Sequence, residues 1–255
     1  MRNIQYLIGI CVSSFLGMTN VYGQLDGKQG ASDRITHSVM IGYNIGATAP
    51  FSLPNTIRGI NSYSLLFTPA VSYEIHYQLS ESWGIGSGLR FDGKGMKISD
   101  SVQYFHTIIT MDDGEFEGDF TGTNQTNSKN LYLSVPIYGV YKSGFWNFEL
   151  GGYVAHTLSR RFDGSVSDGY IRKGNSLGEK VLIEKAVFDF ADQVKNWDWG
   201  IIAGANRRIG EHWGVNSDVQ LGLEPIFPKS FRGVGYDLRN IYLTIGVSYN
   251  LGSFL

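Results

Sequence analysis

The feature that most constrains this chain is a strict alternation of short and long connections between eight segments of period-two hydrophobicity. These segments are 38–47, 64–79, 83–92, 131–142, 145–158, 197–209, 213–224 and 240–251. The short connections, "SES", "SG" and "GEH", join the second segment to the third, the fourth to the fifth and the sixth to the seventh. Long stretches join the others, at 48–61, 99–128, 160–195 and 225–237. Alternation with period two is typical of β-strands whose two faces meet different surroundings.

An even number of strands with short turns at one end and long loops at the other predicts an all-β fold. We expect an eight-stranded antiparallel up-and-down transmembrane β-barrel, with short periplasmic turns and long extracellular loops. Glycine and aromatic residues are abundant (33 Gly, 15 Tyr, 15 Phe, 5 Trp) and proline is scarce (6), which favours strands and turns over helices. After residue 23 the chain lacks about 18 consecutive apolar residues, so a helical crossing is excluded. A soluble β-sandwich with the tryptophans as core anchors is the alternative. In a closed barrel of eight strands the apolar face must point outward, because the inside is nearly full and holds the charged residues.

The first 23 residues have the pattern of a cleaved secretory signal. Arg2 gives a positive start, 6–18 is mostly apolar, and "VYG" precedes the expected cut. Residues 24–255 then form the outer-membrane barrel domain, located in the cell outer membrane after export. Cys11 is the one cysteine and lies in the signal, so no disulfide or cysteine metal site is expected in the exported chain.

Partners and cofactors are constrained by charge and composition. The formal net charge of −2 gives no basic bias, so no nucleic-acid partner is expected. No cofactor and no metal site are predicted. The acidic stretch 111–120 leaves one alternative open, a calcium bridge, but its spacing is not that of an EF-hand loop, and a solvated acidic loop is favoured. Its carboxylates are Asp112, Asp113, Glu115, Glu117 and Asp119.

Charged residues occupy the face of the strands that would point into the barrel. They are Glu74, His76, Arg90, Asp92, Glu149, Asp198, Arg208, Asp218 and Glu224. We expect one group around Arg90 and Asp92 and a second group formed by Asp198, Arg208 and Asp218. A mutually paired polar network that satisfies buried charge is the favoured interpretation. A path for protons or very small ions, or an acid–base pair, is the alternative.

Glycines on the same inward face indicate how a narrow barrel is filled. If the tight turns set the register, small residues oppose large ones: Gly86 and His76, Gly88 and Glu74, Gly204 and Asp218, Gly214 and Arg208, Ser134 and Tyr153, Ala155 and Tyr132. Eight strands leave an interior just wide enough for side chains, so the sequence predicts a plugged barrel and not a porin.

Two further patterns belong to the membrane environment. Trp83, Trp146 and Trp213 each start a strand beside a short turn, which predicts a periplasmic aromatic girdle. In the last segment, "TIGVSYNL" resembles the final-strand signal read by the barrel-assembly machinery, through Thr244, Gly246, Tyr249 and Leu251. The terminal aromatic of that signal is either Tyr249 or Phe254.

Catalysis finds little support in the sequence. Near the outer end of the segment 145–158, His156 and Ser159 are the one close serine–histidine pair, and their spacing places them on opposite faces of a strand. The stretch 177–194, "LGEKVLIEKAVFDFADQV", is expected to form a short helix over the barrel mouth or a partner-binding hook. The loops 99–128 and 160–195 are therefore the expected functional surface.

Several strand motifs resemble a known family. "GLRFDGKGMKI" (88–98), "NLYLSVPIYGVY" (130–141), "FELGGYVAHTL" (148–158) and "WDWGIIAGANRRI" (197–209) are similar to strands of the PorT-like outer-membrane barrels of the Bacteroidetes. The resemblance covers about residues 35–255. It implies the barrel fold, and some members of that family belong to the type IX secretion apparatus.

The sequence thus favours a non-enzymatic structural or interaction protein, with an accessory role in a secretion or envelope complex as one form of it. The expected partners are outer-membrane lipid and lipopolysaccharide, the barrel-assembly machinery during insertion, and such a complex. The alternatives are a narrow channel and an outer-leaflet lipid-modifying enzyme.

Overall fold

The computed structural model describes residues 34–111 and 114–252. The predicted signal peptide, Asp112, Asp113 and Phe254 lie outside the described residues. The described ranges hold a short 3-10 helix, η2 (Ala191–Gln193), and eleven strands. The strands are β1 (Ile35–Ala49), β2 (Ile57–Leu65), β3 (Pro69–Gln78), β4 (Trp83–Met111), β5 (Gly114–Ser143), β6 (Trp146–Ser159), β7 (Phe162–Lys173), β8 (Lys180–Asp189), β9 (Trp197–Ile209), β10 (Trp213–Gly222) and β11 (Arg239–Gly252).

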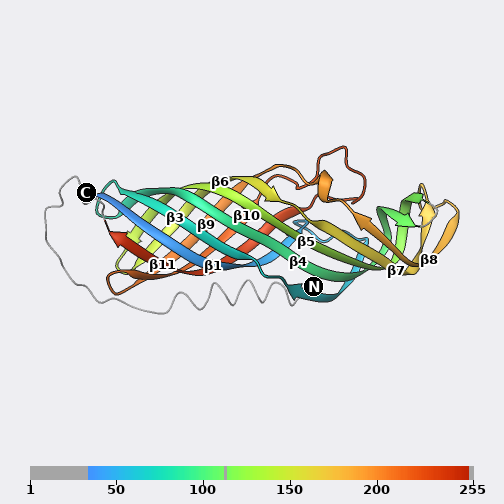
Figure 1. Ribbon diagram of the computed structural model, residues 1–255, viewed down its shortest axis with the longest axis horizontal. Coiled ribbons are helices and arrows are strands. Elements are labelled where there is room, and N and C mark those ends of the chain that lie inside the picture. Colours follow the sequence, from blue (N-terminus) through green and yellow to red (C-terminus); the bar gives the residue numbers. More distant parts are fainter. Residues whose placement is uncertain (1–33, 112–113, 253–255) are drawn as a thin grey trace. The chain divides into compact units, whose positions relative to one another are not determined.

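Eight of these strands pair into a closed antiparallel ring, which Figure 1 shows as strands crossing at a marked tilt. The order around the ring is β1, β3, β4, β5, β6, β9, β10, β11 and back to β1. The last strand meets the first with Val247 opposite Ile41. Each ring strand overlaps one of the eight predicted segments, so the predicted antiparallel β-barrel is confirmed, with three further strands outside the ring.

The two faces of the ring differ as a membrane barrel requires. Ile41, Ile137 and Leu150 point outward and are 67%, 67% and 66% exposed. On the inward face, Ala155 and Ser134 are buried. An apolar outside around a polar inside suits a strand between lipid and a filled lumen. Within the described ranges, no helix combines the length and the apolar character that a membrane crossing demands.

Three strand pairs are joined by tight turns, and in two of them, β3–β4 and β9–β10, the register is the one predicted from the turn length. Gly86 and Gly88 lie opposite His76 and Glu74, and Gly204 and Gly214 oppose Asp218 and Arg208. A Cβ at Gly86 would come within 2.2 Å of the Tyr138 ring, so this glycine makes room for a tyrosine in the lumen.

The register between β5 and β6 was predicted wrongly. Ser134 pairs with Ala155, and Tyr153 faces Pro136, because Ser143 pairs with Trp146 around a turn formed by Gly144 and Phe145. Gly144 has a φ of 58°, a left-handed conformation that glycine adopts at little cost. The turn therefore lies one residue further along than "SG", and this shifts every β5–β6 pair by two.

Beyond the ring, β4 and β5 continue as one long hairpin. They contain 29 and 30 residues, whereas about 9–11 suffice for a crossing. The pairing of β4 with β3 ends at Asp92, and β5 continues past its last β6 partner, Ser159. Residues 99–111 and 114–128 thus lie in a pair of strands, where a long loop was expected.

Three more strands join this hairpin to form what we call the extracellular sheet. It consists of β2, residues 96–111 of β4, residues 114–130 of β5, β7 and β8. Figure 1 shows β7 and β8 where the hairpin extends past the ring. β2 pairs with β4, β7 with β5, and β8 with β7. The stretch 177–194 forms β8 and η2, so the predicted helix over the mouth is wrong. The extracellular sheet has a hydrophobic core of its own, which includes Val102, Phe105, Ile109, Phe120, Phe162, Val166, Ile171, Ile183 and Phe188.

Candidate functional site

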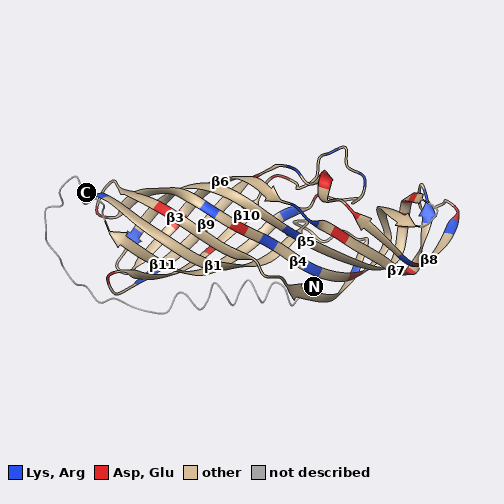
Figure 2. Ribbon diagram, in the orientation of Figure 1, with Lys and Arg blue, Asp and Glu red and all other residues tan. Residues whose placement is uncertain are grey.

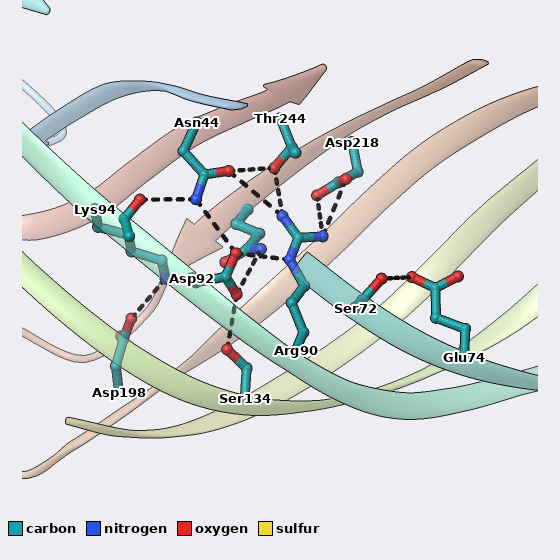
Figure 3. Close-up of polar contacts among 12 residues, drawn as sticks. Asn44, Ser72, Glu74, Arg90, Asp92, Lys94, Ser134, Asp198, Asp218 and Thr244 are labelled. Carbon is teal, nitrogen blue, oxygen red and sulfur yellow. Dashed lines mark hydrogen bonds and ion pairs between the residues drawn. The ribbon is translucent and has the colours of Figure 1, made fainter. Parts of the chain in front are cut away.

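The polar lumen of the ring is the candidate site, and Arg90 on β4 is its centre (Figure 3). Its Nε donates to Asp92 Oδ1 at 2.6 Å, and Nη1 donates to both carboxylate oxygens of Asp218 at 3.1 Å. Its Nη2 donates to Thr244 Oγ1 and to Asn44 Oδ1. Arg90 is 3% exposed. Because a guanidinium has five donors in a rigid fork, one buried arginine joins strands on opposite sides of the lumen.

Asp92 completes this centre from the same strand. It is fully buried and accepts hydrogen bonds from Ser134 Oγ at 2.7 Å, Asn44 Nδ2 at 3.3 Å and Gln220 Nε2 at 3.4 Å. These partners come from β5, β1 and β10. A buried carboxylate with this many donors is well compensated, so the arrangement has the character of a structural network.

A second ion pair lies toward the long-loop end. Lys94 is fully buried, and its Nζ lies 3.1 Å from Asp198 Oδ2 on β9. The same ammonium lies over the rings of Tyr153 and Tyr132, at 4.6 and 5.0 Å from their centroids. Asp198 Oδ2 also accepts from the Tyr153 hydroxyl and from Asn240 Nδ2.

The short-turn end of the lumen has a third group. Ser72 Oγ and the Tyr138 hydroxyl donate to the two oxygens of Glu74, at 2.8 and 3.2 Å. His76 Nε2 lies 2.9 Å from the same tyrosine hydroxyl. Glu149 faces this group across a cavity of about 10 Å³ that Arg90 and Asp218 also line. Such a volume holds about one water molecule.

Two of the predicted lumen residues lie elsewhere. Arg208 is exposed at the end of β9 and donates to the Gly144 carbonyl at 2.8 Å, so it does not join Asp198 and Asp218. Glu224 follows β10 and pairs with Lys195 at the long-loop end. The predicted second group was wrong for a geometric reason: Asp218 meets Arg90 across the lumen, and Asp198 meets Lys94.

Sequence reasoning missed Lys94 and most of the uncharged partners. Lys94 is two residues after Asp92 on β4 and therefore points to the same side as Arg90 and Asp92. Extending the predicted strand past residue 92 would have placed Lys94 in the lumen. Asn44 and Thr244 carry no comparable signal, because their contacts cross between strands far apart in the sequence. Thr244 had been predicted only as part of the barrel-assembly signal.

The predicted aromatic girdle lies on the outer face at the short-turn end. Trp83 packs on Tyr141 and Trp213 on Tyr249, each pair with ring centroids 4.9 Å apart, and Trp146 stacks on Phe148. Trp197 marks the opposite end, against His156. In the predicted assembly signal, Gly246 lies close to β1, while Leu251 points outward. Recognition of this signal by the barrel-assembly machinery stays a prediction.

The structure gives no support to the other two candidate sites, the acidic stretch and the serine–histidine pair. Glu117 and Asp119 contact the ring nitrogens of His106, at 3.2 and 3.0 Å, in place of converging on a cation. Among the described residues, no cluster of three His, Cys, Asp or Glu side chains is arranged to hold a metal ion. His156 packs against Trp197, and within the described ranges no hydrogen bond joins it to Ser159.

A closed ring with an apolar outside and a polar, filled inside defines an outer-membrane β-barrel of the narrow type. The family model described as "Outer membrane protein beta-barrel domain" matches residues 26–228, and the chain belongs to that family. Its place is therefore the outer membrane.

Solved structures with similar folds include the attachment invasion locus protein Ail of Yersinia pestis, at 10% identity and a TM-score of 0.37, over 85% of this chain and 97% of that one. The outer membrane protein OprG of Pseudomonas aeruginosa shares 10% identity at a TM-score of 0.33, over 86% and 94%. These low scores support no functional inference. No curated protein matches the chain significantly.

Proposed function

We propose that this protein is a non-conducting membrane anchor that acts by binding, and that it presents the extracellular sheet to a partner. One observation carries the proposal: the ring strands β4 and β5 continue without a break into a sheet that has its own hydrophobic core. A lipid crossing alone needs neither that length nor that core.

The lumen supports the non-conducting part of the proposal. Arg90 and Lys94 are held in ion pairs that cross the interior, and the cavity beside Arg90 and Asp218 has a volume of about 10 Å³. A hydrated ion needs a continuous water path, which side chains occupy here.

The far end of the extracellular sheet supports the binding part. Leu177, between β7 and β8, is 92% exposed, and Leu182 on β8 is 77% exposed. Large apolar side chains in such positions are what a partner would cover. The resemblance to PorT-like barrels makes a secretion or envelope complex the first class of partner to test. A cleaved signal peptide and insertion by the barrel-assembly machinery are part of the same proposal.

The test is affinity capture of the tagged full-length protein from native outer membranes after brief crosslinking, with mass spectrometry of what is recovered. The variant Leu177→Ser/Leu182→Ser should lose the partner. The control Phe51→Ser/Leu53→Ser also replaces two exposed apolar residues with serine, but between β1 and β2, and should retain the partner. Recovery of the barrel alone from the wild type, or equal loss in both variants, would contradict the proposal.

A narrow channel is the second candidate, favoured by the water-sized cavity among Glu74, Glu149 and Asp218. It differs from the first in one measurable respect, because only a channel gives ionic current across a planar bilayer. A lipid-modifying enzyme would instead change the mass of outer-leaflet lipid when the gene is deleted.

A further inference from the structure

A row of basic side chains lies at the base of the extracellular sheet, on its outer face, just beyond the apolar band of the ring. It consists of Lys97 on β4, Lys129 on β5 and Arg161 after β6, and we call it the basic row. Lys97 lies opposite Asn127, one outward position from Lys129. The backbone N–H of Lys129 donates to the Arg161 carbonyl at 2.9 Å. The three residues are therefore neighbours on three adjacent chain segments.

The basic row directly follows the apolar band, and we therefore place it at the level of the lipid headgroups. On β5, Leu131 is the next outward residue below Lys129, and Leu158 comes three residues before Arg161; both are exposed on the apolar band. Figure 2 shows basic segments on the neighbouring strands β4 and β5 where they leave the ring. Lysine and arginine at this level extend their charged ends into the headgroup region while their stems stay on apolar surface.

The charges of the basic row are only partly compensated within the chain. Arg161 pairs with Asp163 at 2.6 Å and keeps a side chain that is 61% exposed. Asp163 also accepts from Asn127 at 3.3 Å. Lys97 and Lys129 are exposed, and no carboxylate among the described residues lies within ion-pair distance of either. The two lysine ammonium groups thus lack a carboxylate partner among the described residues, beside a guanidinium that is paired with Asp163.

We propose that the basic row binds the phosphate groups of an outer-leaflet glycolipid. Phosphate is the anion present at that level of an outer membrane, and both lysine and arginine bind it well. The acyl chains of the same lipid would lie along the apolar face below, so one molecule satisfies both surfaces. This inference is independent of the proposed partner of the extracellular sheet.

The test is a titration of the purified full-length protein in detergent with diphosphoryl lipid A and with the same lipid after dephosphorylation, counted as bound adducts by native mass spectrometry. The wild type should prefer the phosphorylated lipid. Lys97→Gln/Lys129→Gln should reduce that preference by about fivefold for each lysine, because a basic side chain near a lipid surface contributes on the order of 1 kcal/mol.

Controls separate the site from general charge. Lys185→Gln/Lys229→Gln removes the same charge from exposed positions away from the basic row and should leave the preference intact. Lys97→Arg/Lys129→Arg should retain it. Heat-modified migration in gels shows that each variant is folded. A wild type without preference, equal loss in both glutamine variants, or displacement by an equal concentration of inorganic phosphate would overturn the proposal.

Discussion

At the scale of single residues, Arg90 is the group on which the lumen depends most. Replacing it with methionine leaves Asp92 and Asp218 buried without their main cation. Removal of one partner of a buried ion pair costs about 3–5 kcal/mol. We expect Arg90→Met to lower the free energy of unfolding by that amount, measured by urea unfolding in detergent with tryptophan fluorescence.

Arg208→Gln is the matched control for that experiment. This residue lies on the same face parity but is exposed at the strand end, where it donates to a turn carbonyl. Its loss should cost less than about 1 kcal/mol, the range of exposed interactions. Equal destabilisation by the two variants would show that the network contributes nothing beyond a surface contact.

Lumen contacts between adjacent strands could be predicted from the sequence, whereas contacts across the ring could not. Adjacent strands are fixed by the turns, so Gly86 opposite His76 is predictable from turn length alone. The contact between Arg90 and Asp218 is not, because β4 and β10 lie across the ring from each other and meet only through strand tilt and stagger. One-residue uncertainty in a turn also shifts whole pairings, as at Gly144.

At the scale of elements, the extracellular sheet should unfold separately from the ring. Phe120 is fully buried in its core, and truncation of a buried phenylalanine costs about 3–5 kcal/mol. We expect Phe120→Ala to speed tryptic cleavage in β7 and β8 while heat-modified migration of the barrel is unchanged. Phe145→Ala makes the same change at an exposed turn residue and should leave both unchanged. Loss of the barrel band in Phe120→Ala would instead indicate one cooperative unit.

The same sheet should have a pH dependence that comes from Asp100. This residue lies beyond the membrane on β4, and burial raises its pKa to about 6, while Asn124 donates to it at 2.9 Å. A carboxyl whose folded-state pKa exceeds its unfolded one contributes stability below the unfolded value, and this is lost as pH rises through the folded value.

The extracellular sheet is therefore expected to resist proteolysis better at pH 4.5 than at pH 7.5, with the change falling between the unfolded pKa of about 4 and the folded pKa of about 6. Asp100→Asn should remove this dependence and stabilise the sheet at neutral pH by up to about 3 kcal/mol. The measurement is the rate of cleavage by a protease whose own activity has been calibrated at each pH. An unchanged pH profile in the variant would assign the effect to another group.

The ring strands were predictable and the extracellular sheet was not, for one physical reason. In the ring, every second residue faces lipid and is apolar, so segments such as 240–251 show hydrophobicity with a period of two. Outside the membrane no such demand exists: on β5, Asn124, Thr126 and Ser128 are buried and polar, so the pattern fades although the strand continues. The residues of β8 alternate poorly for the same reason.

At the scale of the whole molecule, the closed lumen has a direct electrical consequence. Side chains from the ring strands meet in the interior, and the rings of Tyr132 and Tyr153 flank Lys94 at its long-loop end. We expect the reconstituted protein to give no ionic current above background in planar bilayers. Tyr132→Ser/Tyr153→Ser removes both rings from a fully buried layer, lets water in, and should give a small cation-dependent current.

The double variant also shows whether an absence of current from the wild type reflects a closed lumen or failed insertion into the bilayer. If the wild type is silent and Tyr132→Ser/Tyr153→Ser conducts, insertion has succeeded and the side chains are the barrier. Steady current from the wild type would overturn the non-conducting anchor in favour of a narrow channel. In that case the group formed by Glu74, Glu149 and Asp218 around the water-sized cavity becomes its narrow point, and Glu149→Gln should then change the dependence of current on pH.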